Sequence, residues 1–128
     1  MLPSIVAVAF LLSGVCIDDG APLYSSRYAQ CQDESEGVDA AMHDCIAAEL
    51  ELQDARLNAV YHTLADSESS LGRKKLVAAQ SAWLKYRDAN CEFYADPDGG
   101  TAAALIAHDC VLRETAERVL ELDALKQP

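Results

Sequence analysis

The segment that decides the fold is residues 79–110, AQSAWLKYRDANCEFYADPDGGTAAALIAHDC, because a strong helix break divides it into two helix-forming halves. The break is Asp96-Pro97-Asp98-Gly99-Gly100, in which proline lacks a backbone N–H and the paired glycines favour a turn. On either side, the residues of one helical face recur every three or four positions. Before the break these are Leu76, Ala79, Trp83, Tyr86, Asn90 and Phe93, and after it they are Leu105, His108, Leu112, Thr115, Val119 and Leu122. We therefore predict helices over about 72–94 and 101–125, the second with Thr101 as its N-cap.

A third predicted helix precedes these two, over about 42–65, and a polar link at 66–72 separates it from the next. Its apolar stripe comprises Ile46, Leu50, Leu57, Val60 and Leu64, with the polar Gln53 on the same face. Hydrophobic residues make up 51% of the 128-residue chain and aromatic residues only 6%, a composition typical of helices rather than sheets. Because short links make consecutive helices antiparallel, we predict one all-α domain, a small antiparallel bundle of about three helices.

Four of the five cysteines, Cys31, Cys45, Cys91 and Cys110, allow three disulfide pairings. Cys91 and Cys110 are equidistant from the Gly100-Thr101 break, and Cys31 and Cys45 are equidistant from a point beside Gly37. Each pair is therefore placed to join the two arms of a turn. We predict the disulfides Cys31–Cys45 and Cys91–Cys110, each worth about 3 kcal/mol in the chain-entropy model.

The N-terminus predicts export. An uninterrupted apolar run, Ile5 to Leu12, is too short to span a bilayer and suits a signal peptide over residues 1–16. An N-terminal segment at 17–41, tied to the domain by a disulfide, and a helical domain at 42–128 would follow, with no transmembrane segment after leader removal. We expect a secreted or periplasmic protein. A lipid anchor on Cys16 is an alternative that Val15 disfavours, and a buried N-terminal helix is one that Pro3 disfavours.

Antiparallel register about the 66–72 link places specific residues of the first two long helices at the same height. Leu57 falls level with Trp83, Asn58 with Gln80, and Asp54 within about a turn of Arg87. This register predicts a hydrogen-bonded polar layer between the two helices, with Trp83 in the core, where truncation to alanine costs roughly 3 to 5 kcal/mol. A catalytic role for Asp54 and Arg87, as an acid and a neighbouring cation, is less favoured than this structural one.

The charge balance, 21 acidic against 10 basic residues, gives a formal net charge of −11. A broadly negative surface disfavours nucleic acid and anionic membrane as partners. It would steer a basic protein towards the domain, although most acidic domains are simply soluble ones.

Two repeated triplets, His43-Asp44-Cys45 and His108-Asp109-Cys110, are the features that invite a catalytic or metal-binding interpretation. Successive helical residues point about 100° apart, so one triplet cannot form a catalytic triad. Both triplets together supply two imidazoles and two thiols, a possible zinc set, but export favours disulfides. The sequence contains no phosphate-binding loop or nucleophile elbow. We expect no cofactor, no metal and no enzymatic activity.

Several segments between about Cys31 and Leu122 resemble the LprI-type lysozyme-inhibitor family. They are Asp44-Cys45, DARLNAVY at 54–61, AQSAWLKYRDANC at 79–91, Gly99-Gly100-Thr101, Cys110 and TAER at 115–118. Segment 38–43 departs from the family pattern and keeps Met42 only. The family's signature positions correspond to Cys45, Asp54, Leu57, Asn58, Tyr61, Gln80, Trp83, Arg87, Cys91, Cys110 and Arg118.

The resemblance implies a secreted or periplasmic protein that binds a basic partner, lysozyme, and inhibits it. The signature residues lie on predicted inward stripes, so we interpret them as structural. The exposed connections are better candidates for the interface. These are residues 67–73 and above all Asp96, Asp98, Gly99, Gly100 and Thr101. An envelope immunity or adaptor protein with a different partner is the alternative function.

Overall fold

A computed structural model of the chain describes residues 22–126, and over this range the chain is helical without a strand. The helices are α1 (Ser26–Glu34), α2 (Asp39–Ser67), α3 (Ser70–Phe93) and α4 (Gly100–Ala124). The all-α fold is confirmed, but this part of the chain holds four helices rather than about three. The unpredicted helix is α1, which is nine residues long and buries no side chain, so it has no apolar stripe to reveal it. The predicted signal peptide and Cys16 lie outside the described residues.

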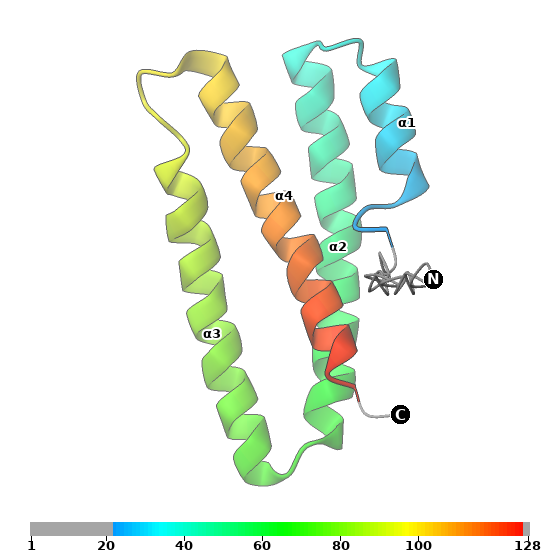
Figure 1. Ribbon diagram of the computed structural model, residues 1–128, viewed down its shortest axis with the longest axis vertical. Coiled ribbons are helices and arrows are strands. Elements are labelled where there is room, and N and C mark those ends of the chain that lie inside the picture. Colours follow the sequence, from blue (N-terminus) through cyan, green and yellow to red (C-terminus); the bar gives the residue numbers. More distant parts are fainter. Residues whose placement is uncertain (1–21, 127–128) are drawn as a thin grey trace, which may run out of the picture.

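The three long helices are antiparallel in sequence order, and α4 runs diagonally between α3 and α2 (Figure 1). The main helix contact is α2 against α4, whereas α2 and α3 meet little beyond their turn. The short α1 packs along the other side of α2. One end of the molecule therefore carries the α1–α2 and α3–α4 connections, and the opposite end carries the α2–α3 turn.

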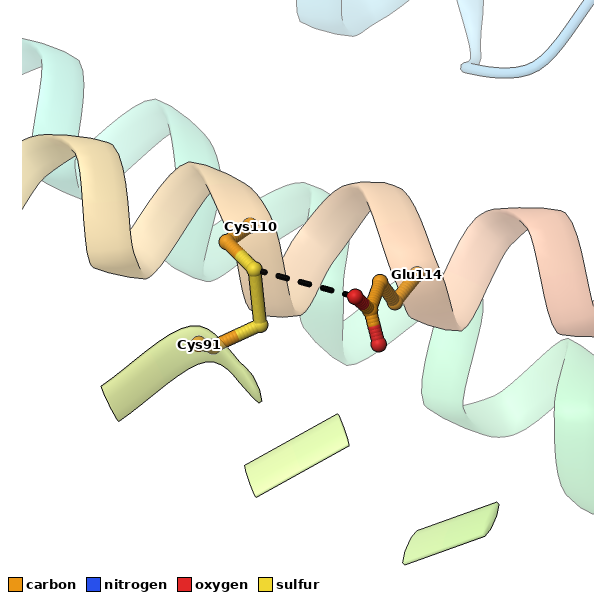
Figure 2. A group of neighbouring side chains, drawn as sticks. All are labelled: Cys91, Cys110 and Glu114. Atoms are coloured by element: carbon orange, nitrogen blue, oxygen red, sulfur yellow. Dashed lines mark hydrogen bonds between the residues drawn. A yellow bond between two sulfur atoms is a disulfide. The ribbon is translucent and has the colours of Figure 1, made fainter. Parts of the chain in front are cut away.

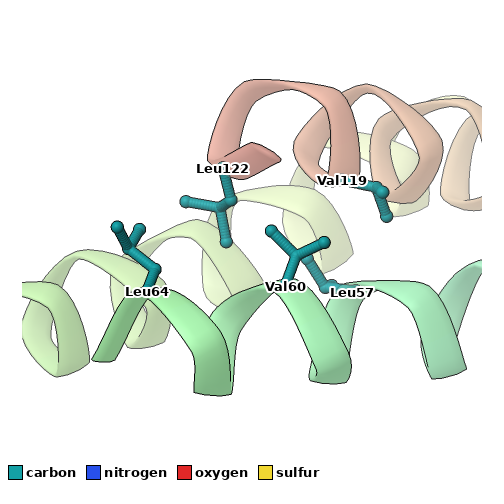
Figure 3. Packing of buried hydrophobic residues seen from close by; sticks show 5 residues of the cluster. All are labelled: Leu57, Val60, Leu64, Val119 and Leu122. Atoms are coloured by element: carbon teal, nitrogen blue, oxygen red, sulfur yellow. The ribbon is translucent and has the colours of Figure 1, made fainter. Parts of the chain in front are cut away.

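The hydrophobic core lies where α2 crosses α4. Figure 3 shows Leu57, Val60 and Leu64 of α2 facing Val119 and Leu122 of α4. These residues follow the predicted three-and-four spacing of the two stripes. The side chains of Leu112 and Leu122 are fully buried, and Gln53 and Thr115 are also buried at polar positions of the same stripes.

Helix α3 is less buried than its sequence predicts, since Cys91 is its one fully buried residue. Its inward face carries Leu76, Gln80, Trp83, Arg87 and Asn90, all half-buried. The predicted stripe is wrong at Ala79, Tyr86 and Phe93, which are exposed. The predicted and the observed inward faces share Leu76, Trp83 and Asn90. They differ where the prediction took the apolar Ala79 and Tyr86 in place of their polar neighbours Gln80 and Arg87.

Local signals fix the helix ends. Ser69 caps α3, its Oγ accepting a hydrogen bond from the Gly72 N–H at 3.1 Å. The predicted cap of α4 is wrong, because Thr101 lies inside the first turn and Gly99 is the N-cap without a side-chain bond. Gly100, the first residue of α4, adopts a φ of +64°, a left-handed conformation that costs glycine little.

A buried carboxylate ties the chain before α1 to α2. Glu49 accepts hydrogen bonds from the Ser25 N–H at 2.8 Å, the Ser25 Oγ at 2.6 Å and the Gln53 Nε2 at 3.0 Å. Burial alone would raise the pKa of Glu49, but the hydrogen bonds outweigh it and hold the pKa below its ordinary value. The pairing of Ser25 with Glu49 joins residues far apart in the sequence and leaves no local pattern.

Candidate protein-binding site

Both predicted disulfides are present, and both lie towards the end of the molecule that carries the α3–α4 connection. Cys31 pairs with Cys45 and joins α1 to α2, with 5.7 Å between the Cα atoms. Cys91 pairs with Cys110 and joins α3 to α4 across 5.5 Å. Each disulfide fixes one hairpin close to its turn, so this end of the bundle is covalently braced.

The predicted interface residues lie on the α3–α4 connection and the first turn of α4, and all of them are exposed: Asp96, Asp98, Gly99, Gly100 and Thr101. The connection is structured. Asp96 Oδ1 accepts a hydrogen bond from the Asp98 N–H at 2.9 Å, and the Asp96 carbonyl accepts one from the Gly99 N–H at 3.0 Å. A Cβ on Gly99 would lie 2.6 Å from the Ala103 Cβ, so a larger residue would displace the turn. The site therefore presents its two carboxylates on a preformed loop.

Exposed apolar side chains that the sequence analysis missed surround this loop. Phe93 is 81% exposed and packs edge to face with Tyr94, at 5.6 Å between ring centroids. Ile106, on the first turns of α4, is also exposed. Phe93 was predicted to point inward, and Ile106 lay one residue beside the predicted stripe. Exposed aromatic side chains are enriched at the centres of protein interfaces, whose rims are polar.

A pocket of about 440 Å³ lies between α1 and α4, beside the same end of the molecule. Its apolar lining includes Met42 and Ile46 of α2, and Tyr94 and Ile106 of the exposed group also border it. Tyr28 lines the pocket from α1, and burial, with a smaller contribution from the Asp109 charge, raises the pKa of its hydroxyl. The tyrosine hydroxyl stays protonated at neutral pH, where it offers a hydrogen-bond donor at the rim.

The predicted polar layer between α2 and α3 is wrong, and hydrogen bonds join α3 to α4 instead. Arg118 Nε donates to Gln80 Oε1 at 3.0 Å, and Arg87 Nη1 donates to Thr115 Oγ1 at 3.2 Å. Both guanidinium groups lie over the Trp83 ring, Arg87 at 5.3 Å and Arg118 at 5.6 Å from its centroid.

The other expected members of that layer, Asp54 and Asn58, are exposed on α2. The predicted register is wrong because α2 and α3, although consecutive, do not pack against each other along their length. Helix α4 instead packs against both α2 and α3. Leu57 and Tyr61 do contribute to the hydrophobic core, and Trp83 packs against its edge.

The two His-Asp-Cys triplets do not form the zinc set considered above, because Cys45 and Cys110 belong to different disulfides and supply no thiolate. Glu114 lies beside the Cys91–Cys110 bridge, with Oε1 3.9 Å from Cys110 Sγ (Figure 2). A disulfide sulfur carries no proton, so this approach is a contact and not a metal site or a catalytic pair. The two imidazoles, in contrast, do meet, with 2.9 Å between the Nδ1 atoms of His43 and His108.

Within residues 22–126, none of the helices combines the length and the apolar character needed to cross a bilayer.

The comparisons with known proteins identify one family. Residues 31–122 match the family described as Lysozyme inhibitor LprI. No curated protein and no solved structure matches the chain. The matched range includes both disulfides, the residues around Trp83 and the exposed α3–α4 connection. The chain therefore belongs to the LprI lysozyme inhibitor family.

Proposed function

We propose that this protein inhibits lysozyme by binding it outside the cytoplasm, without catalysis of its own. The observation that carries the proposal is the family match over residues 31–122. Two disulfides within a domain of this size support an oxidising compartment, secreted or periplasmic.

Electrostatics support a basic partner. The chain carries a formal net charge of −11, and its exposed acids include Asp96 and Asp98 on the α3–α4 connection. A negative surface attracts a positively charged protein over several ångströms and raises the association rate. Lysozyme fits this requirement, because its common forms are basic.

We assign the contact to the end of the molecule that carries the α3–α4 connection. The lysozyme cleft holds two carboxyl groups, so a carboxylate placed between them would be repelled. The neutral side chains of Phe93 and Tyr94 are suited to approach the cleft, while Asp96 and Asp98 face basic groups around it. An exposed aromatic group on a braced loop loses little conformational entropy on binding.

A lysozyme activity assay with increasing amounts of the purified domain tests the function. We expect inhibition that saturates with a defined stoichiometry and weakens as salt rises, because screening acts over about 8 Å at physiological ionic strength. The variant Asp96→Asn/Asp98→Asn should associate about tenfold more slowly at low salt. Asparagine keeps the oxygen that accepts the Asp98 N–H bond, so the loop should keep its shape.

The α2–α3 turn provides the matched control, since it was the second candidate interface. Asp66→Asn/Glu68→Gln removes the same charge at the opposite end of the bundle, from residues that are also exposed. We expect this variant to keep most of its association rate. If it lost binding and the Asp96/Asp98 variant did not, the interface would lie at the α2–α3 turn. Failure of the wild-type domain to bind lysozyme at low salt would leave the envelope immunity or adaptor alternative.

A further inference from the structure

The pocket between α1 and α4 combines an apolar lining with two opposite charges. The apolar side chains come from α2, from the α3–α4 connection and from α4: Met42, Ile46, Tyr94, Leu105 and Ile106. Asp109 and Arg113, about one turn apart on α4, line the pocket as well. Its volume of about 440 Å³ falls within the usual range of small-molecule sites, about 300–1,000 Å³.

The disulfides hold the walls of this pocket in place. Cys110 lines the pocket and is bonded to Cys91 of α3. Ile46, which lies at its apolar side, directly follows Cys45, and Cys45 is bonded to Cys31 of α1. The helices around the pocket are therefore joined covalently beside it. A site that is already formed loses little conformational freedom when a ligand binds.

Asp109 and Arg113 are only loosely paired with each other. Asp109 Oδ2 and Arg113 Nη1 are 3.9 Å apart, which is beyond hydrogen-bond distance, and the side chains are 43% and 45% exposed. Each can therefore bind a ligand group of opposite charge. Asp109 would repel a purely anionic ligand, and Arg113 a purely cationic one. The two residues together favour a ligand that carries both charges side by side.

An α-amino acid has this charge arrangement, because its ammonium nitrogen and carboxylate oxygens are about 3 Å apart. With the ammonium at Asp109 and the carboxylate at Arg113, the side chain of the amino acid is left for the apolar lining. Tyr28 and Tyr94 border the pocket, and aromatic rings pack favourably against one another. We propose that this pocket binds a free amino acid with an aromatic side chain, of the phenylalanine type.

One observation that is independent of the charges also points to a ligand. Gln32 of α1 lines the pocket, and its buried Nε2 has no hydrogen-bond partner among the described residues. A buried donor without a partner is unfavourable. Rotation of this half-buried side chain can direct the amide into the pocket, where a ligand carboxylate accepts its hydrogen bond.

A nuclear magnetic resonance titration of the full chain with phenylalanine at pH 7 tests the site. We expect a dissociation constant of about 1 mM, as befits a small ligand, with the largest shifts at residues 105–113 and 28–32. Alanine, which lacks the ring, should bind at least about tenfold more weakly. N-acetylphenylalanine, which lacks the ammonium charge, should bind about fivefold more weakly. Binding of N-acetylphenylalanine as tight as that of phenylalanine, or no shifts around the pocket, would overturn the proposal.

Variants of the two charged residues test the same recognition from the protein side. Arg113→Gln and Asp109→Asn should each weaken phenylalanine binding about fivefold. Both side chains are largely exposed, so the fold should be kept, which circular dichroism checks. Arg56→Gln is the matched control, because it removes the same charge from an exposed arginine outside the pocket, and its binding should be unchanged.

A second ligand makes the assignment of Arg113 more specific. Phenylalaninamide lacks the carboxylate that Arg113 is proposed to bind. Replacing phenylalanine with phenylalaninamide should therefore cost less affinity in Arg113→Gln than in the wild type. The same cost in both proteins, or equal phenylalanine binding by wild type and a folded Arg113→Gln variant, would contradict the proposal. These titrations contain no lysozyme, so their outcome is independent of the proposed inhibition.

Discussion

The α2–α4 crossing and helix α3 are built by different means. Where α2 meets α4, leucine and valine side chains face each other and are buried, Leu122 fully so. Helix α3 is of similar length to α4, yet its one fully buried residue is a disulfide-bonded cysteine. Leu76 and Trp83 pack against the edge of the core, and polar and cation–π contacts add to this attachment. The α2–α4 pair therefore supplies most of the stability, while α3 is attached to it.

This attachment leaves apolar surface uncovered. The large hydrophobic residues of α3 that remain exposed are Leu71, Val77, Leu84, Tyr86 and Phe93. Isolated exposed apolar residues are common in soluble proteins, but a whole helix that buries so little is unusual. We infer that α3 and its connection to α4 can bind a partner protein because the α2–α4 crossing holds the fold together without them.

The largest effect should come from the α2–α4 crossing. Leu112→Ala removes a fully buried side chain and should lower the free energy of unfolding by about 2 to 5 kcal/mol, measured by urea denaturation. Leu71→Ala on α3 is the matched control, since that side chain is mostly exposed, and it should cost less than about 0.5 kcal/mol. Equal losses in the two variants would remove the distinction between the regions.

The next largest effect should come from the disulfide that attaches α3. Replacing Cys91 and Cys110 with serine opens a loop with a sequence separation of 19 and should cost about 3 kcal/mol. Because α3 has few buried contacts of its own, its amides should lose hydrogen-exchange protection before those of α2. Uniform loss of protection would show that α3 is as well packed as the other helices.

A smaller effect is expected at Trp83. The sequence placed this residue in the core and predicted a cost of 3 to 5 kcal/mol, but the ring is half-buried at the edge of the core, in contact with two arginines. Trp83→Ala should cost about 2 kcal/mol, less than the loss of a fully buried tryptophan, because part of the ring already lies in water. Thermal unfolding of Trp83→Ala beside Leu112→Ala would check the ranking.

Much of the fold was predictable from local patterns. The long helices were predicted by the stripe on α2 and the break at 96–100. Both disulfides were predicted by the symmetric cysteine spacings. Each of these signals depends only on neighbouring residues or on a turn. The position of α4 between α2 and α3 was not predictable, since it depends on which apolar faces fit together. For the same reason Gln80 and Arg87 were assigned partners on α2, while their actual partners are on α4.

The candidate site was predicted in part. The acidic loop is exposed as expected, because proline and glycine keep it out of the helices. Phe93 was missed because an aromatic residue at helical spacing normally points inward, and its exposure depends on where α3 ends. The contact of His43 with His108 was considered only as part of a cysteine-containing set, and it forms because α2 packs along α4.

The smallest predicted effect concerns pH and the two histidines that meet between α2 and α4. His108, which faces His43 and lies next to Asp109, has a pKa lowered below 6.5, first by burial and then by His43. As the pH falls, the unfolded chain therefore binds a proton at His108 at a higher pH than the folded protein does. The free energy of unfolding is then highest above pH 6.5 and decreases as the pH falls below it. His108→Gln should flatten this part of the stability–pH curve, measured by urea denaturation from pH 7.5 to 5. The exposed control His62→Gln should keep the wild-type slope.

We propose that a stable α2–α4 crossing carries a less stable α3, whose connection to α4 binds the partner. Hydrogen exchange of the whole domain, measured residue by residue with and without saturating lysozyme, tests both parts at once. In the free protein we expect amides of α3 to exchange faster than those at the centres of α2 and α4, and lysozyme to slow exchange around residues 93–101. Exchange in α3 as slow as in α2 and α4, or protection by lysozyme confined to the α2–α3 turn, would contradict the account.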